Sequence, residues 1–225
     1  MLNIVIPMAG RGSRFKDEGF ALPKPLIPVH GKPMIHLVVD NLRPRRDHRF
    51  IFICLREHLD GYGLATHLTE WAPGSVVIPI DEVTQGAACT VLLAREYIDS
   101  NDSLLIANCD QWIDTDIDAF LDEADRPELD GLIMTMKADD PKWSFVKFGT
   151  DGKVSAVLEK QVVSDEATVG IYHFKKGAQF VAGADQMIDE DRRVNGEFYV
   201  APVYNELLAQ GAKLEAGGTY EGLGY

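Results

Sequence analysis

Short apolar runs alternate with amphipathic stretches through the first half of the chain. The runs at 4–6, 50–55, 76–80 and 103–107 have the length and continuity of strands that are covered on both faces. The stretches at 33–42, 58–70 and 86–97 place apolar residues at helical spacing. This alternation predicts an α/β fold, a Rossmann-like, doubly wound and mostly parallel sheet.

The pattern changes after residue 131. Short strands are expected at 132–136, 145–148, 154–157 and 168–174, and the middle two predict a β-hairpin added to the sheet. Helices are expected at 177–188 and 198–210, and a last strand at 213–216. With no repeat or linker in view, we expect one domain over residues 1–225, with halves 1–130 and 131–225.

Composition narrows the class of protein. The 225 residues carry a formal net charge of −13, which argues against a nucleic-acid backbone or an anionic membrane as partner. No apolar run is long enough to span a bilayer, and no leader pattern opens the chain, so we expect a cytoplasmic protein. The three cysteines have no C-x-x-C spacing, which disfavours disulfides and zinc.

The first strand leads directly into a glycine-rich segment. It reads Ala9-Gly10-Arg11-Gly12-Ser13-Arg14 and is followed by Pro23-Lys24-Pro25. The glycines let the backbone approach a ligand closely, and Arg14 and Lys24 add positive charge that suits phosphate oxygens. The segment therefore predicts a nucleoside triphosphate held by its phosphates.

Other interpretations of this segment fit less well. A Rossmann dinucleotide site would have a third glycine where Phe15 stands, and the Walker P-loop pattern does not occur. Either cation alone is equally consistent with a solvated loop charge. Their occurrence together, with prolines on both sides of Lys24, favours the phosphate site.

These motifs resemble the opening of the sugar-phosphate nucleotidyltransferases, also called nucleotide-sugar pyrophosphorylases. The resemblance implies the nucleotide-diphospho-sugar transferase fold, with a nucleotide-binding half at 1–130 and an acceptor-binding half at 131–225. It implies Arg14 and Lys24 as catalytic residues. It also assigns nucleotide binding to the following set: Ala9, Gly10, Gly12, Ser13, Gln85 and Gly86.

Gln85 and Gly86 stand immediately before a predicted helix. A glutamine side chain offers both a donor and an acceptor, which suits the edge of a nucleobase, although a plain helix entry explains the pair equally well. In the family this segment contacts the base, typically of pyrimidine nucleotides, so CTP or UTP is the expected substrate.

Asp110 follows the fourth strand directly. A carboxylate at the carboxyl end of a strand, opposite a triphosphate, suits Mg²⁺, whereas an aspartate there is also common as a turn or helix cap. The family's second metal ligand corresponds to Gly222 in this sequence, and Glu221 is one position away. We expect Mg²⁺ as cofactor, held by Asp110 with Glu221 as a second candidate.

Three later segments resemble the family's acceptor site. Glu159 and Lys160 match a Glu-Lys pair that binds sugar hydroxyls and the acceptor's phosphate, although a surface ion pair is the simple alternative. Gly170 matches a glycine against which a sugar packs. Glu197, in Asn195-Gly196-Glu197-Phe198-Tyr199, matches a further sugar-binding glutamate.

The resemblance predicts an enzyme that moves CMP or UMP from a triphosphate to a sugar phosphate or another phosphorylated small molecule and releases pyrophosphate, as in polysaccharide biosynthesis. A nucleotide-sugar-dependent glycosyltransferase, with Asn108-x-Asp110 as its metal motif, and a non-catalytic nucleotide-binding relative are the alternatives. The sequence does not identify the acceptor or decide whether the chain forms a homo-oligomer. It also leaves open whether the C-terminus is truncated or a fused domain follows Tyr225.

Overall fold

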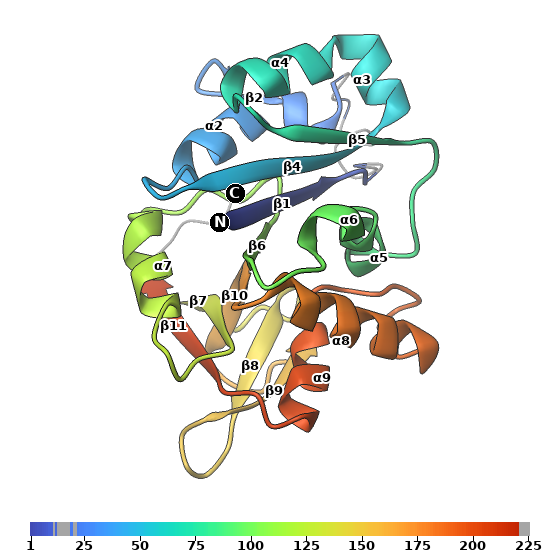
Figure 1. The fold of residues 1–225 in the computed structure, drawn as a ribbon. Coiled ribbons are helices and arrows are strands. Elements are labelled where there is room, and N and C mark those ends of the chain that lie inside the picture. The colour runs from blue at the N-terminus through green and yellow to red at the C-terminus, as the bar shows by residue number, and fades with distance from the viewer. Residues whose placement is uncertain (11, 13–18, 20–21, 221–225) are drawn as a thin grey trace.

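A nine-stranded sheet organises the chain, for which the computed structural model describes residues 1–10, 12, 19 and 22–220. Figure 1 shows its strands running through the middle of the molecule with helices on both sides. The strand order is β11-β7-β10-β6-β1-β4-β5, and β8 and β9 are attached through β10. The bounds are β1 (Leu2–Met8), β4 (His48–Leu55), β5 (Val76–Ile80), β6 (Ser103–Ala107), β7 (Gly131–Lys137), β8 (Ser144–Phe148), β9 (Val154–Glu159), β10 (Glu166–Phe174) and β11 (Leu214–Tyr220).

Helices cover both faces of this sheet. On one face, α2 (Met34–Asn41), α3 (Arg56–Tyr62), α4 (Leu64–Trp71) and α7 (Ile117–Ala124) pack over one apolar core. On the other, α5 (Ala87–Leu92), α6 (Arg95–Ile98), α8 (Gly177–Asp189) and α9 (Val203–Ala209) cover a second core. Burial on both sides explains why the central strands are apolar without alternation.

The central strands are parallel, and β1 lies between β4 and β6. The chain passes from β1 to β4 on one side and returns to β6 on the other, which makes the carboxyl ends of β1 and β6 the point where strand order reverses. Sheets of this class bind ligands in the crevice at such a point. The segments that follow β1 and β6 are therefore placed together.

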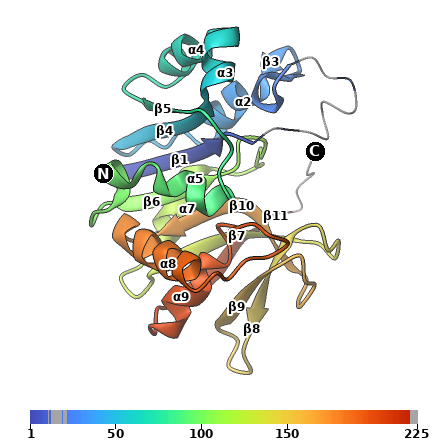
Figure 2. The same cartoon turned by 90° about the vertical axis from the view of Figure 1, so that its right-hand side faces the viewer.

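An antiparallel strand joins the second half to this sheet. β10 pairs with β6, β7 and β8, and β8 pairs with β9 to form the expected hairpin. In Figure 2 this hairpin extends from the end of the molecule opposite α3 and α4. A short 3₁₀ helix, η1 (Lys24–Leu26), and a two-stranded hairpin, β2 (Pro28–Val29) with β3 (Lys32–Pro33), lie between β1 and α2.

The mostly parallel α/β class is confirmed, but three predicted helices differ in extent. The helix expected at 58–70 is divided into α3 and α4 at Gly63, which adopts φ +61°. The helix expected at 86–97 is interrupted after α5, where Leu93 N donates to the carbonyl of Thr90. The helix expected at 198–210 begins only at Val203. The helix α7 was not predicted from the sequence.

Candidate active site

The carboxyl ends of β1 and β6 bring the first group of predicted residues together. Ala9 is buried directly after β1, and Gly10 follows it at the surface. Gly12 adopts φ +57°, and a Cβ added there would lie 3.3 Å from Cβ of Lys24. Gly12 and Lys24 are thus in close contact, an arrangement that is compatible with the predicted phosphate site.

Lys24 and Asp110 form the central pair of this group. Lys24 lies at the start of η1, and its Nζ is 2.5 Å from Oδ2 of Asp110, in the turn after β6. Both side chains are about three-quarters buried, with exposed fractions of 26% and 29%. A cation and a carboxylate held together at the strand ends could meet opposite charges of a metal–triphosphate complex.

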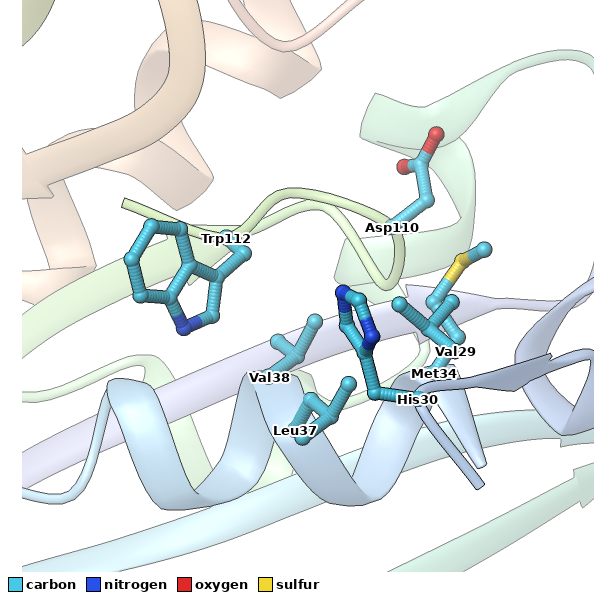
Figure 3. A pocket seen from close by; sticks show the side chains of 7 residues that line it. All are labelled: Val29, His30, Met34, Leu37, Val38, Asp110 and Trp112. Atoms are coloured by element: carbon cyan, nitrogen blue, oxygen red, sulfur yellow. The ribbon is translucent and has the colours of Figure 1, made fainter. Parts of the chain in front are cut away.

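An apolar pocket of about 290 Å³ lies beside Asp110. It is lined by Val29, His30, Met34, Leu37, Val38, Asp110 and Trp112. In Figure 3 the carboxylate of Asp110 points away from the rings of His30 and Trp112, while Leu37 and Val38 project from α2. Its mostly aliphatic and aromatic lining suits an uncharged group better than a triphosphate.

Gln85 and Gly86 lie in the loop before α5, and this loop is bound to the second half of the chain. Phe198 N donates to the carbonyl of Gln85 at 2.9 Å, and Ala88 N donates to the carbonyl of Phe198 at 3.0 Å. Gly86 adopts φ +138°, and a Cβ there would lie 2.4 Å from the oxygen of Phe198. The close approach requires glycine, and it places Glu197 and Tyr199 next to the predicted base-binding loop.

Gly170 makes a second connection between the halves. It adopts φ +79° within β10, and Asn108 N donates to its carbonyl at 3.0 Å. A Cβ at Gly170 would lie 2.1 Å from Nδ2 of Asn108, so the Asn108 side chain accounts for the glycine. The predicted sugar contact at Gly170 stays a prediction. The Asn108–Gly170 hydrogen bond joins the turn that carries Asp110 to the second half of the chain.

Glu159 ends β9 and is almost fully buried, with 6% of its surface exposed. Ser144 Oγ donates to Oε2 of Glu159 from the neighbouring strand β8. Burial raises the pKa of the Glu159 carboxyl, whereas the Ser144 hydrogen bond and the Lys160 charge oppose that rise. The residue is not one half of a solvated surface ion pair.

Lys160 directly follows β9 with φ +56°, a conformation that is uncommon for a residue with a side chain. Its Nζ donates to the hydroxyl of Tyr199 at 2.7 Å and lies 4.8 Å from the centre of the Tyr199 ring. The hydrogen bond to Tyr199 is the main reason that the pKa of Lys160 is raised. The ammonium group is fixed in place and charged at neutral pH.

Some predicted residues lie outside the described residues, namely Ser13, Arg14 and Glu221. Among the residues that are described, no group of three or more His, Cys, Asp or Glu side chains could hold a metal ion. Asp110 therefore offers a single carboxylate in that part of the chain. Within the same part, none of the helices has the length and apolar character that a bilayer crossing requires.

Two functional candidates were not identified from the sequence. Tyr199 was visible beside Glu197 but carried no signal of its contact with Lys160. Ser144 is a polar residue at an inward position of a strand, and an inward hydroxyl in an otherwise apolar strand is the one signal that could have indicated it.

Comparisons with known proteins agree on one family. The family model described as nucleotidyl transferase matches residues 4–204. The bifunctional protein GlmU of Methanococcus maripaludis strain C5 is 25% identical over 177 residues, an alignment that covers 76% of this chain and 39% of that protein. The chain therefore spans well under half the length of this curated relative.

Two solved structures resemble this chain along nearly its whole length. The nucleoside-diphosphate-sugar pyrophosphorylase of Vibrio cholerae RC9 superimposes with a TM-score of 0.76 at 25% identity, covering 95% of this chain and 90% of the other. A Bacillus anthracis protein described as a glucose-1-phosphate thymidylyltransferase has a TM-score of 0.78 at 20% identity, covering 98% and 88%. The second likeness concerns the fold alone.

Proposed function

This chain belongs to the nucleotidyl transferase family, and from that premise we propose that it transfers a nucleoside monophosphate from a nucleoside triphosphate to a phosphorylated small molecule. The observation that carries the proposal is the contact of Lys24 with both Gly12 and Asp110 at the carboxyl ends of β1 and β6. A cation beside a glycine backbone at the strand-order reversal suits a bound triphosphate.

The proposed reaction is an in-line displacement. A phosphate oxygen of the acceptor forms a bond to the α-phosphorus, and the bond from that phosphorus to the oxygen bridging to the β-phosphate breaks. The electron pair leaves with pyrophosphate. Such a transfer depends on alignment and charge neutralisation, which the chain supplies with Lys24, Arg14 and Lys160.

Asp110 is the residue in the described part of the chain that fits Mg²⁺. The ion prefers oxygen ligands, often one or two carboxylates completed by phosphate oxygens and water. When bound, it would neutralise charge on the triphosphate. Turnover of Asp110→Ala and Glu221→Ala over a range of Mg²⁺ concentrations tests this assignment: loss in the first alone supports a single-carboxylate site, and equal loss in both adds Glu221.

The nucleotide and the acceptor belong to opposite halves in this proposal. The Gln85–Gly86 loop supports a compact base, so CTP or UTP is the proposed substrate. Glu159, Lys160 and Glu197 suit an acceptor that carries a phosphate and hydrogen-bond donors such as the hydroxyls of a sugar. Calorimetric titration with the four triphosphates tests base choice, and tightest binding of a purine nucleotide would overturn it.

Pyrophosphate release tests the reaction itself. The protein is incubated with each triphosphate, Mg²⁺ and a panel of sugar phosphates and other phosphorylated metabolites, and pyrophosphate is measured with and without acceptor. Acceptor-dependent release is expected for one pair. Binding of a triphosphate with no turnover across a broad panel would favour a non-catalytic relative, and use of a nucleotide sugar as donor would favour a glycosyltransferase.

A further inference from the structure

A buried polar cluster lies behind the Glu159 carboxylate. Ser144 and Glu159 are direct cross-strand partners in the antiparallel pairing of β8 with β9. Figure 2 shows these two strands side by side in the part of the sheet farthest from α3 and α4. Directly opposed side chains in such a pair are close enough for a hydroxyl on one strand to reach a carboxylate on the other.

A third strand adds two hydroxyl groups. Thr168 and Tyr172 both lie on β10, and their hydroxyl oxygens are 3.0 Å apart. Residues four apart lie on the same face of a strand, and the register of β10 against β7 shifts between these two, so that four steps along β10 pass only two steps of β7. This irregularity shortens the distance between Thr168 and Tyr172 along the strand. Tyr172 also interacts with Ser144, whose hydrogen bond partly offsets the effect of burial on the pKa of Tyr172. All four side chains are buried.

Burying these polar groups costs desolvation free energy, which hydrogen bonds within the cluster must offset. An ionised carboxylate is strongly disfavoured in a buried position unless hydrogen bonds compensate it, and Ser144 is the side chain that donates to Glu159. An apolar residue at position 144 would pack among its buried neighbours Phe145 and Val146 without that requirement. The hydroxyl is therefore explained by the two polar groups that it contacts, the Glu159 carboxylate and the Tyr172 hydroxyl, of which Glu159 is the one to which it donates.

We propose that Ser144 is a positioning residue for acceptor recognition, holding Oε2 of Glu159 so that the remaining acceptor capacity of the carboxylate is turned toward donor groups of the bound acceptor. The expected effect of Ser144 on turnover rests on the proposed function. The structural part of the inference, the orientation and ionisation of Glu159 by Ser144, can be measured without any substrate.

The first experiment follows the titration of Glu159 by carbon NMR of the full chain labelled at the glutamate side-chain carboxyl carbons. The Glu159 signal is assigned by its loss in Glu159→Gln. In Ser144→Ala the carboxylate loses a donor to its charged form, so its titration moves to higher pH. Ser144→Thr keeps the hydroxyl on a β-branched residue that suits a strand and is expected to restore the wild-type titration.

A matched control separates this effect from general loss of a serine. Ser164 Oγ donates to the carbonyl of Val146 at 2.6 Å, two positions along β8 from Ser144. Ser164→Ala is expected to leave the Glu159 titration unchanged. An identical titration in Ser144→Ala and wild type would overturn the inference. A shift shared by Ser144→Ala and Ser144→Thr would assign the effect to packing and would overturn it as well.

Kinetics provide the second readout, once an acceptor is identified by pyrophosphate release. Loss of a hydrogen bond to a charged group predicts about a tenfold rise in the acceptor KM of Ser144→Ala, with the triphosphate KM unchanged. An equal rise in both would contradict a positioning role. If the wild type transfers no nucleotide at all, the proposed function fails while the titration still decides the role of Ser144.

Discussion

At the scale of single residues, Lys24 is the residue on which the proposed function depends most. Its Nζ lies 2.5 Å from Oδ2 of Asp110, and its Cβ lies against Gly12. Lys24 is therefore held between Gly12 and the proposed magnesium ligand. Lys24 lies in a short 3₁₀ helix, and its charged side chain belongs to neither of the two apolar cores. Function and stability should therefore separate cleanly at this position.

We expect Lys24→Ala to lower kcat/KM by a hundredfold or more with little change in melting temperature. Loss of a charge contact that acts in the transition state costs roughly 3–4 kcal/mol. Lys32→Ala is the matched control, because Lys32 is an exposed lysine whose Nζ lies 3.5 Å from Asp40 on the surface. Turnover of Lys24→Ala close to that of Lys32→Ala would remove Lys24 from the mechanism.

Tyr199 allows a graded test of how Lys160 is held. Tyr199→Phe removes the hydroxyl that accepts from Lys160 but keeps the ring beneath the ammonium, whereas Tyr199→Leu removes both contacts. We expect the acceptor KM to rise about tenfold in the first variant and further in the second, because a hydrogen bond to a charged group is worth roughly 1.5 kcal/mol or more.

The comparison variant for Tyr199 is Tyr62→Phe, at an exposed position of α3. Triphosphate affinity should stay constant in all three variants, because the proposed defect lies at the acceptor. If Tyr199→Phe weakened binding of the triphosphate as much as binding of the acceptor, Tyr199 would act at the nucleotide site or in overall stability. The proposed assignment of Tyr199 to the acceptor site would then be wrong.

At the scale of elements, the strands were predictable and the helix boundaries were not. Strand positions followed from apolar runs. β6, which is buried along most of its length, and β5, a half-buried strand at the edge of the sheet, both match the predicted ranges. The predicted helix from 198 failed at its start because Phe198 exchanges backbone hydrogen bonds with the loop at Gln85. Helical periodicity cannot reveal a long-range backbone contact.

The candidate site divides in the same way. Gly12, Lys24 and Asp110 were identified because they follow strands in short motifs, and local sequence fixes which end of the strand they occupy. Ser144 and Tyr199 depend on the pairing of β8 with β9 and on the positive φ of Lys160. Those are tertiary features, and no local sequence pattern predicts them.

Gly86 tests the contact between the halves. A Cβ there would meet the backbone of Phe198 at 2.4–2.5 Å, so Gly86→Ala is expected to separate the loop from Phe198 and weaken both substrates together. Gly74→Ala is the matched control, since Gly74 has φ +80° but open space around its Cβ position. Chemical denaturation should show a larger loss for Gly86→Ala, and equal losses would mean that φ strain alone explains both.

At the scale of the whole molecule, one buried histidine links stability to pH. His173 lies on β10 between β6 and β7 and is 1% exposed. Its Nδ1 is among the described buried side-chain atoms with no hydrogen-bond partner. Burial lowers the pKa of His173 to about 4, an effect that Arg46 and Lys175 reinforce and Asp125 opposes. The folded protein therefore keeps this ring neutral well below the ordinary range.

The sign of the pH effect follows from that shift. An unfolded histidine has a pKa near 6.5, so below this pH the unfolded chain binds a proton that the folded chain excludes. The contribution of the neutral His173 ring to the unfolding free energy is fully present above pH 6.5. It is lost as the pH falls toward 4. A difference of about 2.5 pKa units corresponds to roughly 3 kcal/mol of unfolding free energy.

We therefore expect His173→Leu to flatten the dependence of unfolding free energy on pH between 6.5 and 4, compared with wild type, in urea titrations at several pH values. The carboxylates titrate in both proteins, so the difference between the two curves isolates the histidine. Parallel curves for His173→Leu and wild type would show that the ring at position 173 accepts a proton in the folded protein as easily as in the unfolded chain, contrary to its burial at the centre of the sheet.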